Sequence, residues 1–261
     1  MKIKHLNGAY FRAITDNTSN YQKKMKLYIW SYGIEKLPQG LVPNRCSEIF
    51  DTYIEDKHRF KTEGRWMFVA SGGNLYSRNM ETTFPKHLYL VCSRNLKNIQ
   101  FDYLQKDCSY PFEIVSKDFL DFIIENGMTQ GYDIASLSIV SKAGERLTER
   151  EYYILRFHQF DNALFNFDES EKIEISSIGG NKFLLYPTME LINDTISKSI
   201  FKLGGIEYQK GFIFKENLLE EMLTRFYLPE IYTIADYAKI WWNRQDYPFG
   251  NDLMIKNKLY R

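Results

Sequence analysis

The chain has 261 residues, a formal net charge of +1 and a hydrophobic fraction of 44%, and aromatic residues make up 16% of it. This composition is ample for a packed core, and the length fits one body or two closely packed lobes. The near-zero net charge argues against a wholesale basic nucleic-acid binder, and equally against a strongly acidic mimic of nucleic acid.

The cysteines and the lengths of the apolar segments favour a cytoplasmic protein. The odd number of cysteines and the absence of metal-type spacing favour reduced thiols in a cytoplasm, at Cys46, Cys92 and Cys108. No apolar run approaches about 18 residues, so we expect neither a transmembrane helix nor a membrane partner. The N-terminus has lysines but no apolar segment of the secretory kind. No zinc-type spacing of ligands occurs, and we expect neither metal nor cofactor.

Residues 1–25 predict a basic N-terminal arm that is loosely held, because cations dominate and Asn17 to Asn20 break any periodic pattern. A frayed terminus is the simpler interpretation, and an arm that grips a partner is the alternative. We assign residues 26–261 to a single domain.

Short apolar segments bounded by Gly, Pro and Asn predict strands in the first half of this domain, at 27–32, 66–70, 88–92 and 99–104. Between them, residues 48–60 carry Ile49, Tyr53 and Ile54 at loose helical spacing. We interpret 48–60 as a short helix or an irregular excursion.

The clearest periodic pattern begins at Ser116, whose side-chain oxygen can accept a hydrogen bond from the first turn of a helix. Apolar residues then recur at helical spacing, as Phe119, Leu120, Phe122, Ile123 and Ile124. Gly127 ends the pattern in the manner of a glycine that follows a helix. The sequence predicts a helix from Lys117 to Asn126.

Two strands follow this helix. From Asp133 to Val140 apolar and polar residues alternate, which predicts a half-buried strand with Ala135, Leu137 and Ile139 on its core face. From Glu151 to Phe160 both faces are mostly apolar, which is typical of a strand in the middle of a sheet.

The C-terminal third is interpreted in the same way. We expect strands at 183–186, 199–203 and 211–214, a helical turn or two at 189–196, helices at 216–225 and 233–244, and an irregular tail from 247. When the sequence is aligned with itself at a shift of 99 residues, the strand and helix near 114–124 align with those near 213–223, and their apolar positions match.

The fold class predicted from these elements is α+β, with mixed or mainly antiparallel sheets and a few packing helices. Two lobes of related strand–helix build, 26–175 and 176–261, are an open alternative within the single domain.

Several segments carry a family resemblance. They are LYIWSYG at 27–33, IVSKxFL at 114–120, the Lys-x-Gly turn at 142–144 and YYILRFHQFDNALFNFD at 152–168. Over about residues 30–215 the chain resembles immunity protein family 43 of bacterial polymorphic toxin systems. The resemblance implies a non-enzymatic, cytosolic protein that binds and neutralises one cognate toxin. It carries over no catalytic residue, because the family has no shared active site.

Two segments are candidates for the toxin contact. The most acidic window of the chain contains Asp168, Glu169, Glu171 and Glu174, which could steer a basic partner or form a solvated loop. On the last predicted helix, Trp241 and Trp242 point about 100° apart, so one would be packed and the other more exposed. With Arg244 they are residue types enriched at interface hot spots, although packing at the core rim explains them equally.

The sequence leaves two other function classes open. An enzyme or ligand-binding domain could use Arg156 and His158 on one strand, with Asp161 nearby as a carboxylate partner. A histidine on a largely apolar strand is more often hydrogen-bonded within the core. A self-associating structural protein is the third interpretation, suggested by the aromatic content, and the sequence leaves a homo-oligomer open.

Overall fold

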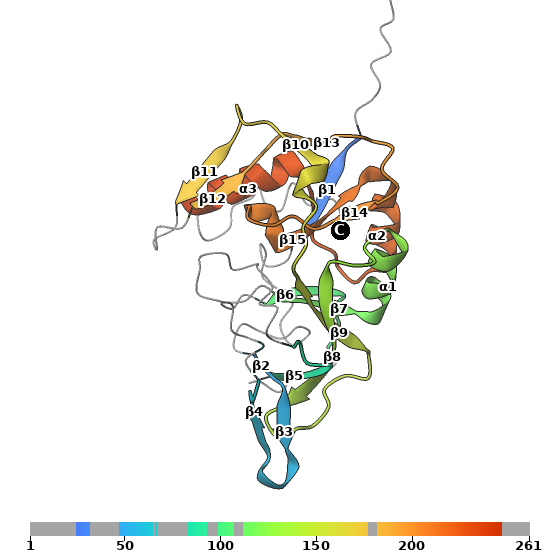
Figure 1. The fold of residues 1–261 in the computed structure, drawn as a ribbon, viewed down its shortest axis with the longest axis vertical. Helices are drawn as coiled ribbons and strands as arrows, with labels where there is room; N and C mark the ends of the chain where they lie inside the picture. Colours follow the sequence, from blue (N-terminus) through green and yellow to red (C-terminus); the bar gives the residue numbers. More distant parts are fainter. Residues whose placement is uncertain are drawn as a thin grey trace, which may run out of the picture.

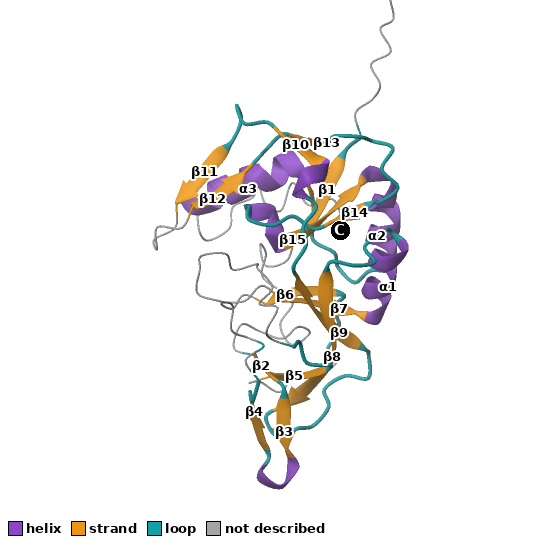
Figure 2. Cartoon of the chain, viewed as in Figure 1, coloured by secondary structure: helices purple, strands orange, loops and turns teal. Residues whose placement is uncertain are grey.

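The computed structural model describes residues 25–31, 47–64, 66, 83–92, 99–106, 112–176 and 182–246. Within these ranges the predicted α+β class is confirmed, since several mainly antiparallel sheets are joined by three α-helices (Figures 1 and 2). Almost all of the predicted arm 1–25, most of the predicted strand 66–70 and the tail from 247 lie outside the described residues. No described helix is long and apolar enough to cross a membrane.

The larger sheet has six strands. Their order is β2 (Glu48–Phe50), β5 (His87–Cys92), β8 (Tyr132–Ser141), β9 (Tyr152–Phe157), β7 (Phe112–Ser116) and β6 (Tyr103–Lys106). Only β5 and β8 run parallel within it. The central position predicted for the strand after Glu151 is confirmed, because β9 lies between β8 and β7. That strand ends earlier than predicted, since the amides of His158 and Gln159 turn to the carbonyl of Gly131.

The smaller sheet has four antiparallel strands, in the order β14 (Ile200–Phe201), β15 (Gly211–Lys215), β1 (Leu27–Ser31) and β16 (Ile231–Thr233). The strand closest to the N-terminus, β1, is thus paired on both sides by strands from the last third of the chain. Its five residues are all buried.

Three two-stranded pairs complete the strands. They are β3 (Thr52–Ile54) with β4 (Arg59–Lys61), β10 (Phe165–Phe167) with β13 (Met189–Leu191), and β11 (Ile173–Ser176) with β12 (Lys182–Leu185). Figure 1 shows β3 and β4 as a hairpin that projects at the end of the molecule opposite the four-stranded sheet. Short 3-10 turns cover Glu55–Lys57, Asn162–Leu164, Glu207–Lys210 and Glu216–Leu218.

Two predictions of helical structure are wrong. Residues 48–60 form β2, β3, a single 3-10 turn and β4, because Ile49 pairs with Leu90 and Tyr53 pairs with Phe60 across strands. Residues 189–191 form β13, which pairs with β10 through Met189 opposite Phe167. In both places a short apolar pattern fits a helix or a strand, and tertiary pairing decides between them.

The helices are α1 (Lys117–Glu125), α2 (Leu219–Arg225) and α3 (Ile234–Asp246). The predicted cap of α1 is confirmed, since Ser116 Oγ accepts the amide of Phe119 at 3.2 Å. Gly127 takes a φ of +97°, where a Cβ would meet the backbone of Lys198 at 3.0 Å. Helix α3 starts behind Thr233, whose hydroxyl accepts the amide of Asp236. The predicted helix at 216–225 begins with a 3-10 turn.

The two sheets contain the same four-stranded unit. The order β6-β7-β9-β8 in the larger sheet matches β14-β15-β1-β16 in the smaller one, and in each unit a helix follows the second of these strands. β7 and β15 start and end 99 residues apart, at 112 and 211 and at 116 and 215. Ile154 pairs with Ile114 as Ile29 pairs with Ile213. The second unit differs in taking its third strand in this order from the N-terminus.

This arrangement bears on the proposed lobes. Because β1 completes a sheet of strands from 200–233, residues 27–31 pack with the C-terminal part of the chain. The division into lobes 26–175 and 176–261 stays a prediction.

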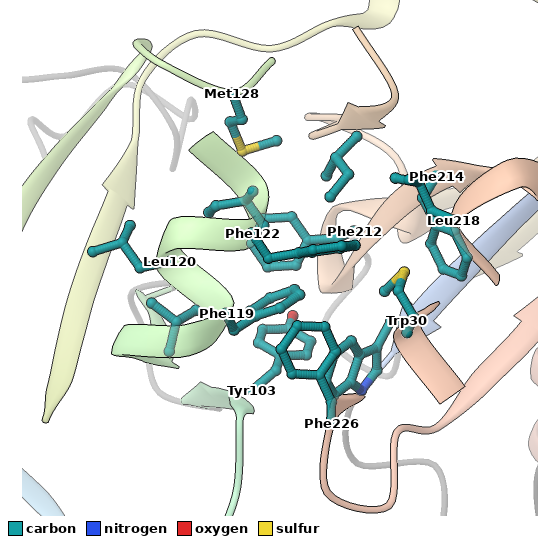
Figure 3. Close-up of a cluster of buried hydrophobic side chains, with 14 of the residues drawn as sticks. Trp30, Tyr103, Phe119, Leu120, Phe122, Met128, Phe212, Phe214, Leu218 and Phe226 are labelled. Carbon is teal, nitrogen blue, oxygen red and sulfur yellow. The ribbon is translucent and has the colours of Figure 1, made fainter. Parts of the chain in front are cut away.

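An aromatic cluster joins the two units. Figure 3 shows side chains from both sheets and from both unit helices meeting in one cluster, which includes Trp30, Tyr103, Phe119, Phe122, Phe212 and Phe226. The ring of Phe119 lies 4.7 Å from that of Trp30 and 5.4 Å from that of Phe212, centroid to centroid. Trp30 and Phe212 lie on β1 and β15 of the smaller sheet, whereas Phe119 lies on α1, which belongs to the unit of the larger sheet. The contact therefore spans the two units.

The far face of each unit has a core of its own. Behind the six-stranded sheet, Leu88, Leu137 and Ile154 share a cluster with Trp66 and Phe101. Behind the four-stranded sheet, α3 contributes residues to a cluster that also holds residues of β1, β15, β12 and β13. Buried apolar layers therefore alternate with the two sheets: one layer lies between the sheets, and one lies on the far face of each sheet.

We expect Phe119→Ala to lower the free energy of unfolding by about 3–5 kcal/mol, because it opens a cavity in the cluster between the units. Urea unfolding followed by tryptophan fluorescence measures this loss. Ile124→Ala on the same helix is the control, since Ile124 is 38% exposed, and its cost should stay below about 1 kcal/mol. Equal losses in the two variants would contradict the central role of the cluster.

Candidate functional site

The acidic window forms an ordered turn that follows β10 and runs into the start of β11. Asp168 Oδ1 accepts the amide of Ser170 at 2.9 Å and its hydroxyl at 2.6 Å. Glu169 pairs with Lys172 at 2.8 Å. All four acids, Asp168, Glu169, Glu171 and Glu174, are exposed. We call this segment, residues 168–174, the acidic turn.

Side chains of the loop between β12 and β13 tie the acidic turn to the body. Tyr186 donates its hydroxyl to Glu169 Oε1 at 3.0 Å, and Thr188 donates its hydroxyl to Glu171. The amide of Asp168 donates to the carbonyl of Thr188 at 3.2 Å. The carboxylates of Asp168, Glu169 and Glu171 are therefore held in fixed positions on the surface.

The acidic turn is charged at neutral pH. Hydrogen bonds from Ser170 lower the pKa of Asp168. The hydrogen bond from Lys172, followed by that from Tyr186, lowers the pKa of Glu169. Because Lys172 is the one cation among residues 168–174, the segment has a net negative charge.

The second predicted contact segment lies on α3. Trp241, Trp242 and Arg244 fall within this helix, as predicted, and their side chains lie outside the described part of the structure. The earlier turns of α3 and the β11–β12 hairpin contribute to the same hydrophobic cluster, through Tyr237 and Ala238 on the helix and Ile173 and Leu184 on the hairpin. The two candidate segments are thus attached to one layer of the fold.

The arginine of the alternative site is engaged in a structural clamp. Arg156 donates to Asp133 Oδ2 from Nε at 3.0 Å and from one terminal nitrogen at 2.8 Å. Its other terminal nitrogen donates to the carbonyl of Trp66, and its guanidinium lies 4.6 Å from the ring centre of Phe84. Asp161, the carboxylate suggested for His158, binds the ammonium of Lys198 at 2.8 Å. Arg156 and Asp161, two charged groups of the alternative site, therefore hold segments of the fold together.

A buried ion pair links the two units next to the aromatic cluster. Lys202, which follows β14, is 3% exposed and pairs with Glu113 on β7, which is 1% exposed. The ammonium also donates to the carbonyls of Gln209 at 2.7 Å and Gly211 at 3.1 Å. Burial lowers the pKa of Lys202, and the carboxylate of Glu113 opposes that shift.

A second buried acid, Asp102, organises three segments. It is 3% exposed, and its Oδ1 accepts the hydroxyl of Ser116 at 2.7 Å and a guanidinium nitrogen of Arg150 at 2.5 Å. Its Oδ2 accepts the amide of Tyr227 at 2.6 Å. Asp102 therefore joins the start of α1, the loop before β9 and the loop between α2 and β16.

Glu113, Lys202 and Asp102 could not be singled out from the sequence. Their only signal is a charged residue beside apolar strand residues, which exposed edge residues share. Among the described residues, no group of three or more His, Cys, Asp or Glu side chains is placed to hold a metal ion. The described cysteine, Cys92, is buried.

We expect Lys202→Met to destabilise the protein by about 3–5 kcal/mol, because it leaves Glu113 as a buried charge without its ammonium. Adding Glu113→Leu should recover much of this loss, since both charges are then gone. Urea unfolding of the single and double variants measures the difference. Lys117→Met removes the exposed pair with Asp121 and should cost less than about 1 kcal/mol. A double variant as unstable as the single one would refute this assignment.

Comparison with known proteins confirms the resemblance that the sequence suggested. The family model described as Immunity protein 43 matches residues 35–249, which is most of the chain. The matched range contains the acidic turn, both unit helices and α3, and it begins after β1. No curated protein matches the chain.

Proposed function

Because the chain belongs to the immunity protein 43 family, we propose that it binds the toxic domain of one cognate bacterial toxin and neutralises it by occlusion. In this proposal it acts in the cytoplasm and performs no chemistry of its own. The observation that carries the proposal is the family match over residues 35–249.

The architecture supports a binding role. The aromatic cluster and the Lys202–Glu113 pair hold the two units together, so surface segments are displayed on a rigid body. Interfaces between preformed surfaces lose less conformational entropy on binding than flexible ones. The candidate catalytic cation, Arg156, is occupied by Asp133 and Trp66, which leaves the non-enzymatic interpretation better supported.

The acidic turn is the best-supported steering surface. A fixed cluster of negative charge attracts a basic partner and orients it before contact, which raises the association rate more than the final affinity. A stable complex would bury on the order of 1,600 Å² in total, with aromatic or arginine anchors inside a charged rim. We assign Trp241, Trp242 and Arg244 on α3 as further contact candidates.

We expect the purified chain to co-purify with the toxic domain encoded by the adjacent gene, and its co-expression to rescue growth of cells that express this toxin. The physical reason is that an occluding partner must bind at least as tightly as the toxin binds its target. Pull-down and growth assays measure the two effects. Absence of both binding and rescue would refute the proposed function.

We expect Glu169→Gln combined with Glu171→Gln to slow association with the same toxin domain by about 3- to 10-fold at low salt, and to flatten its salt dependence. Glutamine keeps an acceptor for Tyr186 and Thr188, so the fold of the turn is retained. Surface plasmon resonance at two salt concentrations measures the rates. Glu220→Gln, an exposed acid on α2, is the control and should leave the rate unchanged. The same rate for the double variant and the wild type would exclude steering by the acidic turn.

A further inference from the structure

The loop between α2 and β16 presents an exposed leucine on an unfavourable backbone. Leu228 has a φ of +44°, and the residue is 48% exposed. Residues with a side chain branched beyond Cβ rarely adopt positive φ, and the residue before a proline, here Pro229, is biased toward extended backbone. Leu228 therefore occupies a conformation that Gly or Asn would adopt more readily.

Among the described residues other than glycine, His58 is the other with positive φ, at +43°. It ends the 3-10 turn of the β3–β4 hairpin, and its ring bonds the hydroxyl of Tyr53 at 3.1 Å. Histidine is among the residues enriched at positive φ. The contrast shows that Leu228 has neither a favourable residue type nor a local polar role.

Both sides of Leu228 are anchored in the body of the protein. Phe226 lies in the aromatic cluster, with its ring centre 5.2 Å from those of Phe119 and Phe122. The amide of Tyr227 donates to the buried carboxylate of Asp102 at 2.6 Å. On the other side, the carbonyl of Glu230 accepts the amide of Ser31 at 3.1 Å. A strained conformation persists only where its surroundings over-determine it, and these anchors do so.

The exposed half of the leucine side chain is not explained by the fold. Phe226 and Glu230 on either side are buried, whereas Leu228 is exposed and adds little to the core. A strained backbone that persists points to a function, and an apolar group on an already ordered loop can enter a partner's pocket without the entropic cost of ordering that loop.

We propose that Leu228 is an apolar anchor of the toxin interface and enters an uncharged pocket on the cognate toxin. This inference rests on the proposed function and deepens it by naming a contact residue. The charged groups connected to the loop's anchors are mutually paired, since Arg150 pairs with Asp102 and Asp118, and Arg225 pairs with Glu221. A rim of balanced charge fits a neutral apolar pocket better than a strongly charged one.

The anchor and the acidic turn have separable effects. Steering acts before contact and changes the association rate, whereas a desolvated anchor changes the dissociation rate. Leu228 is therefore expected to control how long the complex lasts, with the association rate nearly unaffected.

The test measures binding of the inactivated toxic domain encoded by the adjacent gene to the full chain and to two variants. Leu228→Asn removes the apolar group while suiting the backbone, and we expect unchanged or higher thermal stability together with dissociation faster by about 30-fold. Leu228→Met keeps an apolar side chain of similar volume, and we expect dissociation within about 3-fold of the wild type.

The outcomes separate this inference from the proposed function. If the wild type binds and Leu228→Asn dissociates at the same rate, the anchor is refuted and the immunity function stands. A loss of binding accompanied by a fall in thermal stability would also overturn the inference, because the leucine would then act through folding. Failure of the wild type to bind overturns both.

Discussion

The contact between Phe119 on α1 and Trp30 and Phe212 on the other unit is the constraint on which the rest of the structure depends. These rings are nearly or fully enclosed, and they fill the space where the two four-stranded units face each other (Figure 3). Since aromatic pairs combine a large buried area with a preferred geometry, the cluster fixes the relative position of the units. The loop that carries Leu228 is anchored in this cluster through Phe226.

Buried polar groups are located where the two units meet. Lys202, directly after β14, pairs with Glu113 on β7, and Asp102 connects the start of α1 with the loop that follows α2. Such groups add little net stability compared with apolar residues of the same shape, because removing charges from water is costly. Their effect is geometric, since a hydrogen-bonded charge fits only one arrangement of its donors and acceptors.

A rigid two-unit body suits a protein whose proposed task is to recognise one partner. The surface segments differ in character: the acidic turn holds charge in fixed positions, and the loop at Leu228 holds an apolar group on a strained backbone. The acidic turn favours fast association with the partner, and Leu228 favours slow dissociation of the complex. Neither effect requires a catalytic group. The Arg156–Asp133 clamp shows how the charged residues of the sheet contribute to structure.

The sequence by itself determined the elements with strong local signals. The cap at Ser116 and the alternation through Ala135 and Leu137 depend on residues close together in the chain, so helix α1 and strand β8 could be predicted. Tertiary structure decided the rest. Residues 48–50 and 189–191 became strands through pairing partners distant in sequence, and β1 joined strands of the last third. Buried charges such as Lys202 and the positive φ of Leu228 are set by long-range contacts, because local residue patterns do not encode which distant groups will surround them.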